Sequence, residues 1–462
     1  MNPRRAVVLG ILLLTLASWF GIPGHTWLQQ DTQIYVPILE HLRDPGILAK
    51  DIVVERPHVS FTLYDEIALV LNGATGQSFK NILQALQFLT RALGFWGVFL
   101  IARSLQLSRV QAGIVTVFFS LGATIAGPAV LTVELEPTPR AFALPLLFLA
   151  IGFGANAKWL WSGIALGAAT LLHPPTVWPL LPLYLFSRES RRALLPFLTA
   201  LAILLLSAKL QTGVTESQSF FSVLTPKLEM LQRMRATYTW IDFWWRDYLF
   251  QYLLLAGFAY LAAWKLWTRI PTPLRPFIFG LPVIGLLTMP LSWLLQNQLK
   301  WALMPQLQPM RAMLFITAMA SILGVSAALY KRNLAWLLVP CLIPIQSLPP
   351  NLHKPDLAAL SQWAKTSTEK SAVFYFADNT KANYPGIFRA EALRAIYVDW
   401  KGGGQVNYLP QFADEWWSRW QSAASTPPAQ LEIDYLVLNA NHNNPGATQV
   451  FHNSTYAVYK IK

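Results

Sequence analysis

Charged residues are scarce in this sequence. Asp, Glu, Lys and Arg make up 13% of its 462 residues, about half the share of an average soluble domain. Hydrophobic residues make up 54% and there are 19 tryptophans. This composition excludes an ordinary soluble domain and favours a membrane protein, whose tryptophans gather at the bilayer surfaces.

Cysteine is almost absent, because Cys341 is the only one. No disulfide can form within the chain, so any exported domain must be stable without one. Cys341 lies in an apolar run, where a lone cysteine is usually a small apolar filler.

The signatures of soluble enzymes are also missing. The sequence has no P-loop, no G-x-G-x-x-G, no G-x-S-x-G and no zinc-spaced Cys/His set. Its formal charge of +13 is spread in short clusters between apolar runs. A nucleic-acid partner is therefore not expected, since nucleic-acid binding calls for one basic stripe or patch.

Apolar runs long enough to cross a bilayer recur along the first 350 residues, and they predict about eleven transmembrane helices. Two of these runs are short and meet at His173, which predicts a hairpin whose tip stops short of the far surface. The runs cover residues 6–22, 83–102, 110–127, 139–156, 159–173, 175–187, 193–209, 248–267, 277–295, 309–329 and 334–349.

The charges in the loops predict the orientation. Arg4 and Arg5 precede the first run, and no small-residue cleavage site follows it, so we expect an uncleaved helix with a cytoplasmic N-terminus. Alternate loops then carry Lys and Arg with Glu189 as their only acid, as cytoplasmic loops do. An odd number of crossings places the C-terminus outside.

The chain thus divides into a transmembrane domain, residues 1–350, and a soluble extracytoplasmic α/β domain, residues 351–462. The first outer loop, residues 23–82, has amphipathic patterns that predict helices lying on the membrane surface. In the tail, Asp356 is the expected N-cap of a helix, residues 402–404 a flexible turn, and the strands cover 371–377, 393–398, 435–439, 450–452 and 456–461.

Acidic residues gather in the outer loops rather than inside the apolar runs. Asp31 follows the first run and could accept a proton from an incoming hydroxyl, or simply cap the next helix. Glu134 and Glu136 follow the third run and could hold Mg or Mn, or be surface charges beside prolines. The nearly uncharged middles of the runs argue against a transporter, which would need a midplane site.

Two arginines lie on the outer side against the usual charge bias. Arg140 begins the fourth run and Arg311 the tenth, and a guanidinium there could grip a phosphate, reach lipid headgroups or pair with a loop acid. Lys300 is a weaker candidate. His173 and His58 could contact phosphate or acceptor, or serve as capping or packed histidines.

A cluster of tryptophans lies in the second long outer loop. Its side chains could stack on sugar rings or form an interfacial belt. Its members are Trp240, Trp244 and Trp245.

The arrangement resembles the GT-C superfamily of glycosyltransferases. The likeness lies in an acid soon after the first helix, a second acidic cluster after the third, about eleven helices and an outward α/β tail. The segments concerned are Gln30-Asp31-Thr32-Gln33-Ile34-Tyr35 and Glu134-Leu135-Glu136.

The resemblance implies a sugar donor on polyprenyl phosphate or diphosphate, used on the outer face, with Asp31 central to catalysis. Two positions depart from the family pattern. Gln30 stands where many members have a second acid, and Glu134-Leu135-Glu136 replaces the Asp-x-Asp of some members.

The tail also resembles that of an uncharacterised bacterial membrane protein family, in residues 385–389 and 398–401. This likeness implies a bacterial inner membrane and gives no indication of which activity the protein has.

The function expected is transfer of a sugar from polyprenyl phosphate to a lipid, glycan or protein acceptor on the outer face. The alternatives are a non-catalytic GT-C-like scaffold or assembly subunit and, third, a transporter.

Overall fold

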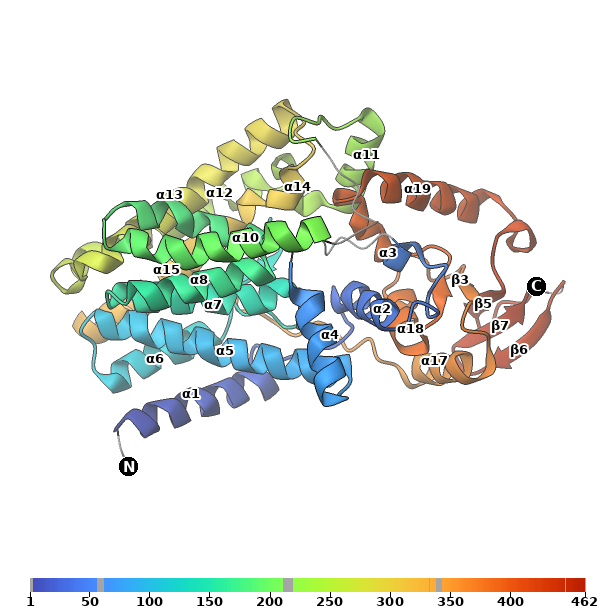
Figure 1. The fold of residues 1–462 in the computed structure, drawn as a ribbon, viewed down its shortest axis with the longest axis horizontal. Coiled ribbons are helices and arrows are strands. Elements are labelled where there is room, and N and C mark those ends of the chain that lie inside the picture. The colour runs from blue at the N-terminus through green and yellow to red at the C-terminus, as the bar shows by residue number, and fades with distance from the viewer. Residues whose placement is uncertain are drawn as a thin grey trace.

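The computed structural model describes residues 3–55, 62–210, 219–331, 333–337, 343–444 and 446–461. Over these residues the protein is mostly helical, with a sheet in its C-terminal part. Figure 1 shows a bundle of long helices at one end of the molecule and the sheet at the other, with α2, α3 and α4 between them.

The bundle is built from apolar helices that pack closely. At the contact between α5 and α7 a Cβ on Gly97 would lie 2.4 Å from the backbone nitrogen of Leu149, so only glycine fits there. The helices are α1 (Pro3–Phe20), α5 (Phe79–Ser104), α6 (Arg109–Ser120), α7 (Pro139–Ala155), α8 (Trp159–Leu172), α10 (Leu194–Leu210), α12 (Trp245–Lys265), α13 (Arg275–Ser292) and α15 (Leu314–Lys331).

Four helical stretches of the described chain are long and apolar enough to cross a membrane. They are Phe79–Ser104, Ser190–Leu210, Thr272–Gln298 and Met304–Tyr330. These helices are compatible with a membrane protein, whereas the predicted number of eleven crossings is not confirmed.

Three predicted apolar helices differ from the structure. In run 110–127, α6 ends at Ser120 and the antiparallel strands β1 (Thr124–Ile125) and β2 (Val130–Leu131) follow. Run 175–187 forms the short α9 (Pro174–Val177) and the 3₁₀ helix η1 (Trp178–Leu185), because its prolines lack amide donors. Run 334–349 forms the 3₁₀ helix η9 (Leu334–Leu337) and no helix over 343–349, and Cys341 lies outside the described residues.

The C-terminal sheet follows the predicted strands. Its order is β4 (Ala395–Ile396), β3 (Val373–Phe376), β5 (Tyr435–Asn439), β7 (Tyr456–Lys460) and β6 (Thr448–His452). Strands β4, β3 and β5 are parallel, and β7 pairs antiparallel with β5 and β6. The predicted final hairpin is confirmed.

Helices cover both faces of this sheet. On one face α17 (Pro355–Ser367) and α18 (Tyr384–Ala392) pack in a core that contains Phe374. On the other face α19 (Pro410–Ser425) places Trp416 in a second core. The N-cap of α17 is Lys354 rather than the predicted Asp356, whose carboxylate instead accepts hydrogen bonds from two side-chain hydroxyls of the final turn, those of Ser454 and Thr455.

The long connection between α1 and α5 joins these two cores. It forms α2 (Thr32–Arg43), α3 (Ile52–Glu55) and α4 (Tyr64–Thr75). The predicted amphipathic segment 34–42 lies within α2, and α4 contains residues 64–71 of the segment predicted over 61–71, which begins outside the described residues. Side chains of α2 enter both cores of the C-terminal part. The two helices α2 and α18 approach so closely that a Cβ on Gly386 would lie 2.2 Å from the Gln33 amide oxygen.

A buried ion cluster lies at this junction. Arg389 Nε lies 2.6 Å from the Asp51 carboxylate, and Arg389 Nη2 contacts Asp399. None of the three side chains is more than 1% exposed. Asp399 also accepts a 2.9 Å hydrogen bond from the amide of Gly402, which begins the 3₁₀ helix η10 (Gly402–Asn407). The cluster therefore ties η10 to the connection that holds α2.

Candidate functional site

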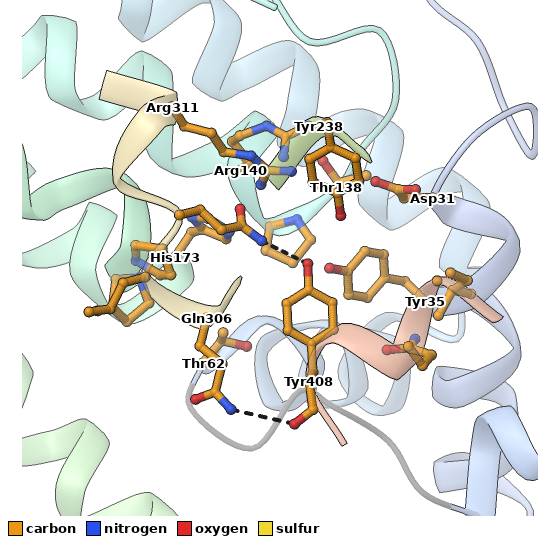
Figure 2. Close-up of a pocket in the computed structure, with 18 of the residues that line it drawn as sticks. Asp31, Tyr35, Thr62, Thr138, Arg140, His173, Tyr238, Gln306, Arg311 and Tyr408 are labelled. Atoms are coloured by element: carbon orange, nitrogen blue, oxygen red, sulfur yellow. Dashed lines mark hydrogen bonds between the residues drawn. The ribbon is translucent and has the colours of Figure 1, made fainter. Parts of the chain in front are cut away.

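A cavity of about 420 Å³ lies where the bundle, α2 and the C-terminal part meet. Segments far apart in the sequence form its walls, and Figure 2 shows polar side chains from each of them pointing into it. Its lining includes Asp31, Tyr35, Thr62, Thr138, Arg140, His173, Arg235, Tyr238, Gln306, Gln308, Arg311, Lys401, Gln405 and Tyr408.

Asp31 lies immediately before α2 and faces the cavity. Its side chain makes no capping hydrogen bond to the helix. Instead its Oδ1 lies 2.7 Å from Lys401 Nζ, and 46% of the side chain is exposed. Lys401, followed by Arg140 and Arg311, holds the pKa of Asp31 well below its usual range, although burial opposes this. Asp31 is therefore a carboxylate at neutral pH.

Arg140 is the second residue of α7 and reaches the same cavity. Its Nε donates to Glu134 Oε1 over 2.6 Å. Glu134 is buried behind Arg140 and does not line the cavity. The alternative that Arg140 pairs with a loop acid is thus observed, and its charge is partly compensated.

Arg311 belongs to the 3₁₀ helix η8 (Pro309–Met313), which leads into α15. Its guanidinium carbon lies 5.5 Å from the centre of the Tyr238 ring, and its Nε is buried without a hydrogen-bond partner. Figure 2 shows Arg311 and Arg140 extending toward the same part of the cavity. The structure therefore brings together Asp31 and both predicted phosphate-binding arginines.

Of the two predicted histidines, His173 lines the cavity. It precedes α9, and its Nδ1 lies 2.6 Å from the Thr176 hydroxyl, so it also has a structural contact. His58 lies outside the described residues. The weaker candidate Lys300 contacts Glu229 and does not line the cavity.

Glu136 is buried beside the segment that leads to Asp31. Its Oε1 accepts hydrogen bonds from the amides of Gln29 (2.6 Å) and Gln30 (2.9 Å), and its Oε2 accepts from the amide (3.1 Å) and hydroxyl (2.6 Å) of Thr32. This carboxylate therefore fixes the backbone around Asp31.

The predicted metal ligands do not fit Mg or Mn in this arrangement. Both oxygens of Glu136 accept N–H or O–H donors, and Glu134 faces the Arg140 guanidinium. Mg requires several oxygen ligands around one point. Over the described ranges no three His, Cys, Asp or Glu side chains are grouped to hold a metal ion.

Several cavity residues were not predicted from the sequence. Burial raises the pKa of Tyr35 and Tyr408 above the usual range, so both stay neutral phenols. Tyr408 Oη accepts a 2.7 Å hydrogen bond from Gln308 Nε2. Lys401 belongs to residues 398–401, one of the two tail stretches that carry the resemblance described above, and that resemblance predicts no role for it.

The structure differs from the prediction at residues 402–404 and at Trp240. Residues 402–404 are not a flexible turn, because they begin the 3₁₀ helix η10, whose Gly403 packs on Trp416. Trp240 of the predicted sugar-stacking cluster is fully buried under the Arg233 guanidinium, 3.9 Å from its ring centre. Trp240 therefore packs inside the protein, which is neither the sugar-stacking nor the interfacial position predicted for it.

One comparison with known families gives a match. A family described as a domain of unknown function (DUF6798) matches residues 355–423. The matched stretch runs from α17 into α19 and contains Arg389, Asp399 and the cavity-lining residues Lys401 and Tyr408. No curated protein matches the chain.

Proposed function

We propose that this protein is an integral membrane glycosyltransferase of the GT-C type. It would transfer a sugar from a polyprenyl-phosphate donor to a lipid, glycan or protein acceptor on the outer face of a bacterial inner membrane. The observation that carries the proposal is the meeting of Asp31, Arg140 and Arg311 in one cavity at the end of the apolar bundle.

The position of the cavity suits a lipid-linked donor. Its wall residues Pro139 and Pro174 begin α7 and α9, and Arg311 lies in η8 shortly before α15. A polyprenyl chain would lie along the apolar helices while its phosphate reaches the two guanidinium groups. Arginine suits this role, because its donors match phosphate oxygens in pairs.

The proposed reaction uses groups that face the cavity. The acceptor hydroxyl oxygen forms a bond to C1 of the sugar as the bond from C1 to the phosphate oxygen breaks, and the phosphate leaves with the electron pair. Asp31 takes the proton of the acceptor hydroxyl once the hydroxyl oxygen begins to bond to C1, because the hydroxyl group then becomes more acidic. Arg140 and Arg311 stabilise the charge that develops on the phosphate.

The proposed topology has about eleven crossings, a cytoplasmic N-terminus and an extracytoplasmic C-terminal domain. The loop charges support it. The 2.7 Å contact between Asp31 and Lys401 agrees with it, since the first connection and the C-terminal domain must then face one compartment.

The test is transfer of labelled sugar from polyprenyl-phosphate donors by the purified full chain. Asp31→Asn and Arg311→Gln should each lower transfer by about a hundredfold or more, since each removes a group that acts in the transition state. Arg246→Gln is the matched control, because Arg246 is an exposed arginine outside the cavity.

Unchanged transfer by Asp31→Asn would remove Asp31 from the mechanism. No transfer from any lipid-linked sugar by the wild-type protein would favour the non-catalytic scaffold, in which the C-terminal domain is presented to a partner.

A further inference from the structure

The charges on the cavity wall are unbalanced. Among the described residues the lining has one carboxylate, Asp31, and four cationic side chains. The cations are Arg140, Arg235, Arg311 and Lys401.

Two of these cations have a carboxylate partner. Arg140 pairs with Glu134 and Lys401 pairs with Asp31. In the part of the chain that the structure describes, neither Arg235 nor Arg311 has a carboxylate within 4.0 Å. Both side chains are partly buried, and removing a guanidinium from water without a partner charge is costly, so an anionic ligand would offset that cost at both positions.

Arg235 is held in a defined geometry. It is the last residue of α11 (Pro226–Arg235), and its guanidinium carbon lies 3.7 Å from the centre of the Trp400 ring. One Nη donates to the Trp400 carbonyl, while Nε is buried without a partner. Stacking on an aromatic face fixes the guanidinium plane and leaves its remaining donors available.

No neighbouring carboxylate among the described residues pairs with the positive charge of Arg235. Asp399 is the carboxylate that acts on it most, yet Asp399 already contacts Arg389 and accepts from the Gly402 amide. Burial lowers the pKa of Arg235 to about 10, so the side chain remains a cation at neutral pH.

The two unpaired arginines come from different walls. Arg311 extends from η8 beside Arg140, whereas Arg235 packs against the C-terminal part through Trp400. Tyr238 also lines the cavity, and the centre of its ring lies 5.5 Å from the Arg311 guanidinium carbon.

We infer that the cavity binds two anionic groups at once, the first at Arg140 and Arg311 and the second at Arg235. The inference rests on the proposed function for the identity of the first group, the donor phosphate. The second group is either a further phosphoryl group of the donor or an acidic group of the acceptor.

The experiment measures binding of inorganic phosphate and pyrophosphate to the purified full chain by calorimetry. If one ligand carries both anions, pyrophosphate should bind at least about tenfold more tightly than phosphate, and Arg235→Gln should abolish that preference. If the anions come from two ligands, two phosphate ions should bind the wild type and one should bind Arg235→Gln.

Controls separate a binding role from a folding role. Arg235→Lys keeps the charge and should retain part of the preference or the second phosphate, while Arg246→Gln should behave as the wild type. A single phosphate with no preference for pyrophosphate, or unchanged binding in Arg235→Gln, would overturn the inference.

The outcome is distinguishable from failure of the proposed function. These probes contain no sugar, so two-anion binding in a protein without sugar transfer would refute the glycosyltransferase and keep the second subsite. Sugar transfer by the wild type together with unchanged anion binding in Arg235→Gln would support the glycosyltransferase and refute the second subsite.

Discussion

At the scale of single residues, ion pairs across the cavity decide which groups are available for chemistry. Asp31 is half exposed and carries its charge because Lys401 lies 2.7 Å away. Glu134, by contrast, is buried and its Oε1 contacts Arg140. Two acids with similar places in the sequence pattern therefore have different surroundings, since Asp31 faces the cavity and Glu134 holds an arginine.

The pair of Asp31 and Lys401 predicts a pH dependence. In the wild type the pKa of Asp31 is held far below neutrality, so its titration should not affect ligand binding or transfer between about pH 5 and pH 8. Lys401→Met removes the largest cause of that lowering, and the pKa of Asp31 should rise. We expect an acid limb to enter this range in a pH profile of transfer.

Asp31→Asn combined with Lys401→Met is the control for this profile, since it lacks the titrating group and should have no such limb. An acid limb that persists in the double variant belongs to another residue.

Arg389 predicts a large effect on stability. Arg389→Met leaves the carboxylates of Asp51 and Asp399 buried without their cation. The loss should be about 3–5 kcal/mol, as for other buried pairs with one partner removed. Thermal unfolding of the full chain measures it. Lys227→Met is the control, because the side chains of Lys227 and its partner Asp414 are 49% and 66% exposed and such pairs contribute about 1 kcal/mol or less.

At the scale of elements, η10 carries the C-terminal wall of the cavity. Two glycines in this short helix meet different surroundings. A Cβ on Gly403 would lie 2.5 Å from the Trp416 ring, whereas a Cβ on Gly404 would meet nothing within 4 Å. Gly403 is therefore needed for the close approach of η10 to α19, and that approach places Lys401 and Tyr408 at the cavity.

Gly403→Ala should push η10 away from Trp416 and cost about 1–3 kcal/mol by overpacking. It should also weaken phosphate binding, because η10 and its flanking residues form one wall of the cavity. Gly404→Ala in the same helix should change stability by no more than about 0.5 kcal/mol. Equal unfolding temperatures for the two variants would contradict this account of the packing.

At the scale of the whole molecule, the connection between α1 and α5 packs against the C-terminal part. Side chains of α2 such as Ile38 and Leu39 enter the two cores of that part. The cavity is consequently enclosed by three regions that fold together, and its walls should not move apart as independent domains.

The proposed topology predicts which introduced cysteines can be labelled from outside the cell. In a variant with Cys341→Ala, Ser425→Cys in the C-terminal domain should react with a membrane-impermeant maleimide applied to intact bacteria. Glu189→Cys, in a loop predicted to be cytoplasmic, should react only after the cells are broken. Both positions are exposed, so the comparison is matched. Reaction of Glu189→Cys in intact cells would overturn the proposed orientation.

Much of the architecture followed from patterns along the chain. Short runs rich in β-branched and aromatic residues located β3, β5 and the hairpin of β6 and β7, since such side chains suit a pleated sheet. Hydropathy located the long helices but overestimated helix in run 175–187, where prolines produce a 3₁₀ segment. Hydropathy reports burial in an apolar medium and does not report backbone donors, which is why the error arose there.

Only part of the candidate site was predicted, because a sequence pattern reports local properties of a residue and not its distant partners. Asp31, Arg140 and Arg311 stand out because each is a charge beside an apolar run, a local property. Arg235 and Lys401 have no such mark, because what distinguishes them is a partner distant in sequence. Trp400 lies 165 residues after Arg235, and Asp31 lies 370 residues before Lys401.

Composition, periodicity and charge placement predicted a chain of apolar helices with a small α/β tail and three charged site residues, because these are local properties. The folded arrangement was needed to see which charges compensate one another, that Glu136 supports the backbone, and that η10 completes the cavity. The physical reason is that electrostatic and packing energies depend on distances in space, which the order of residues does not specify.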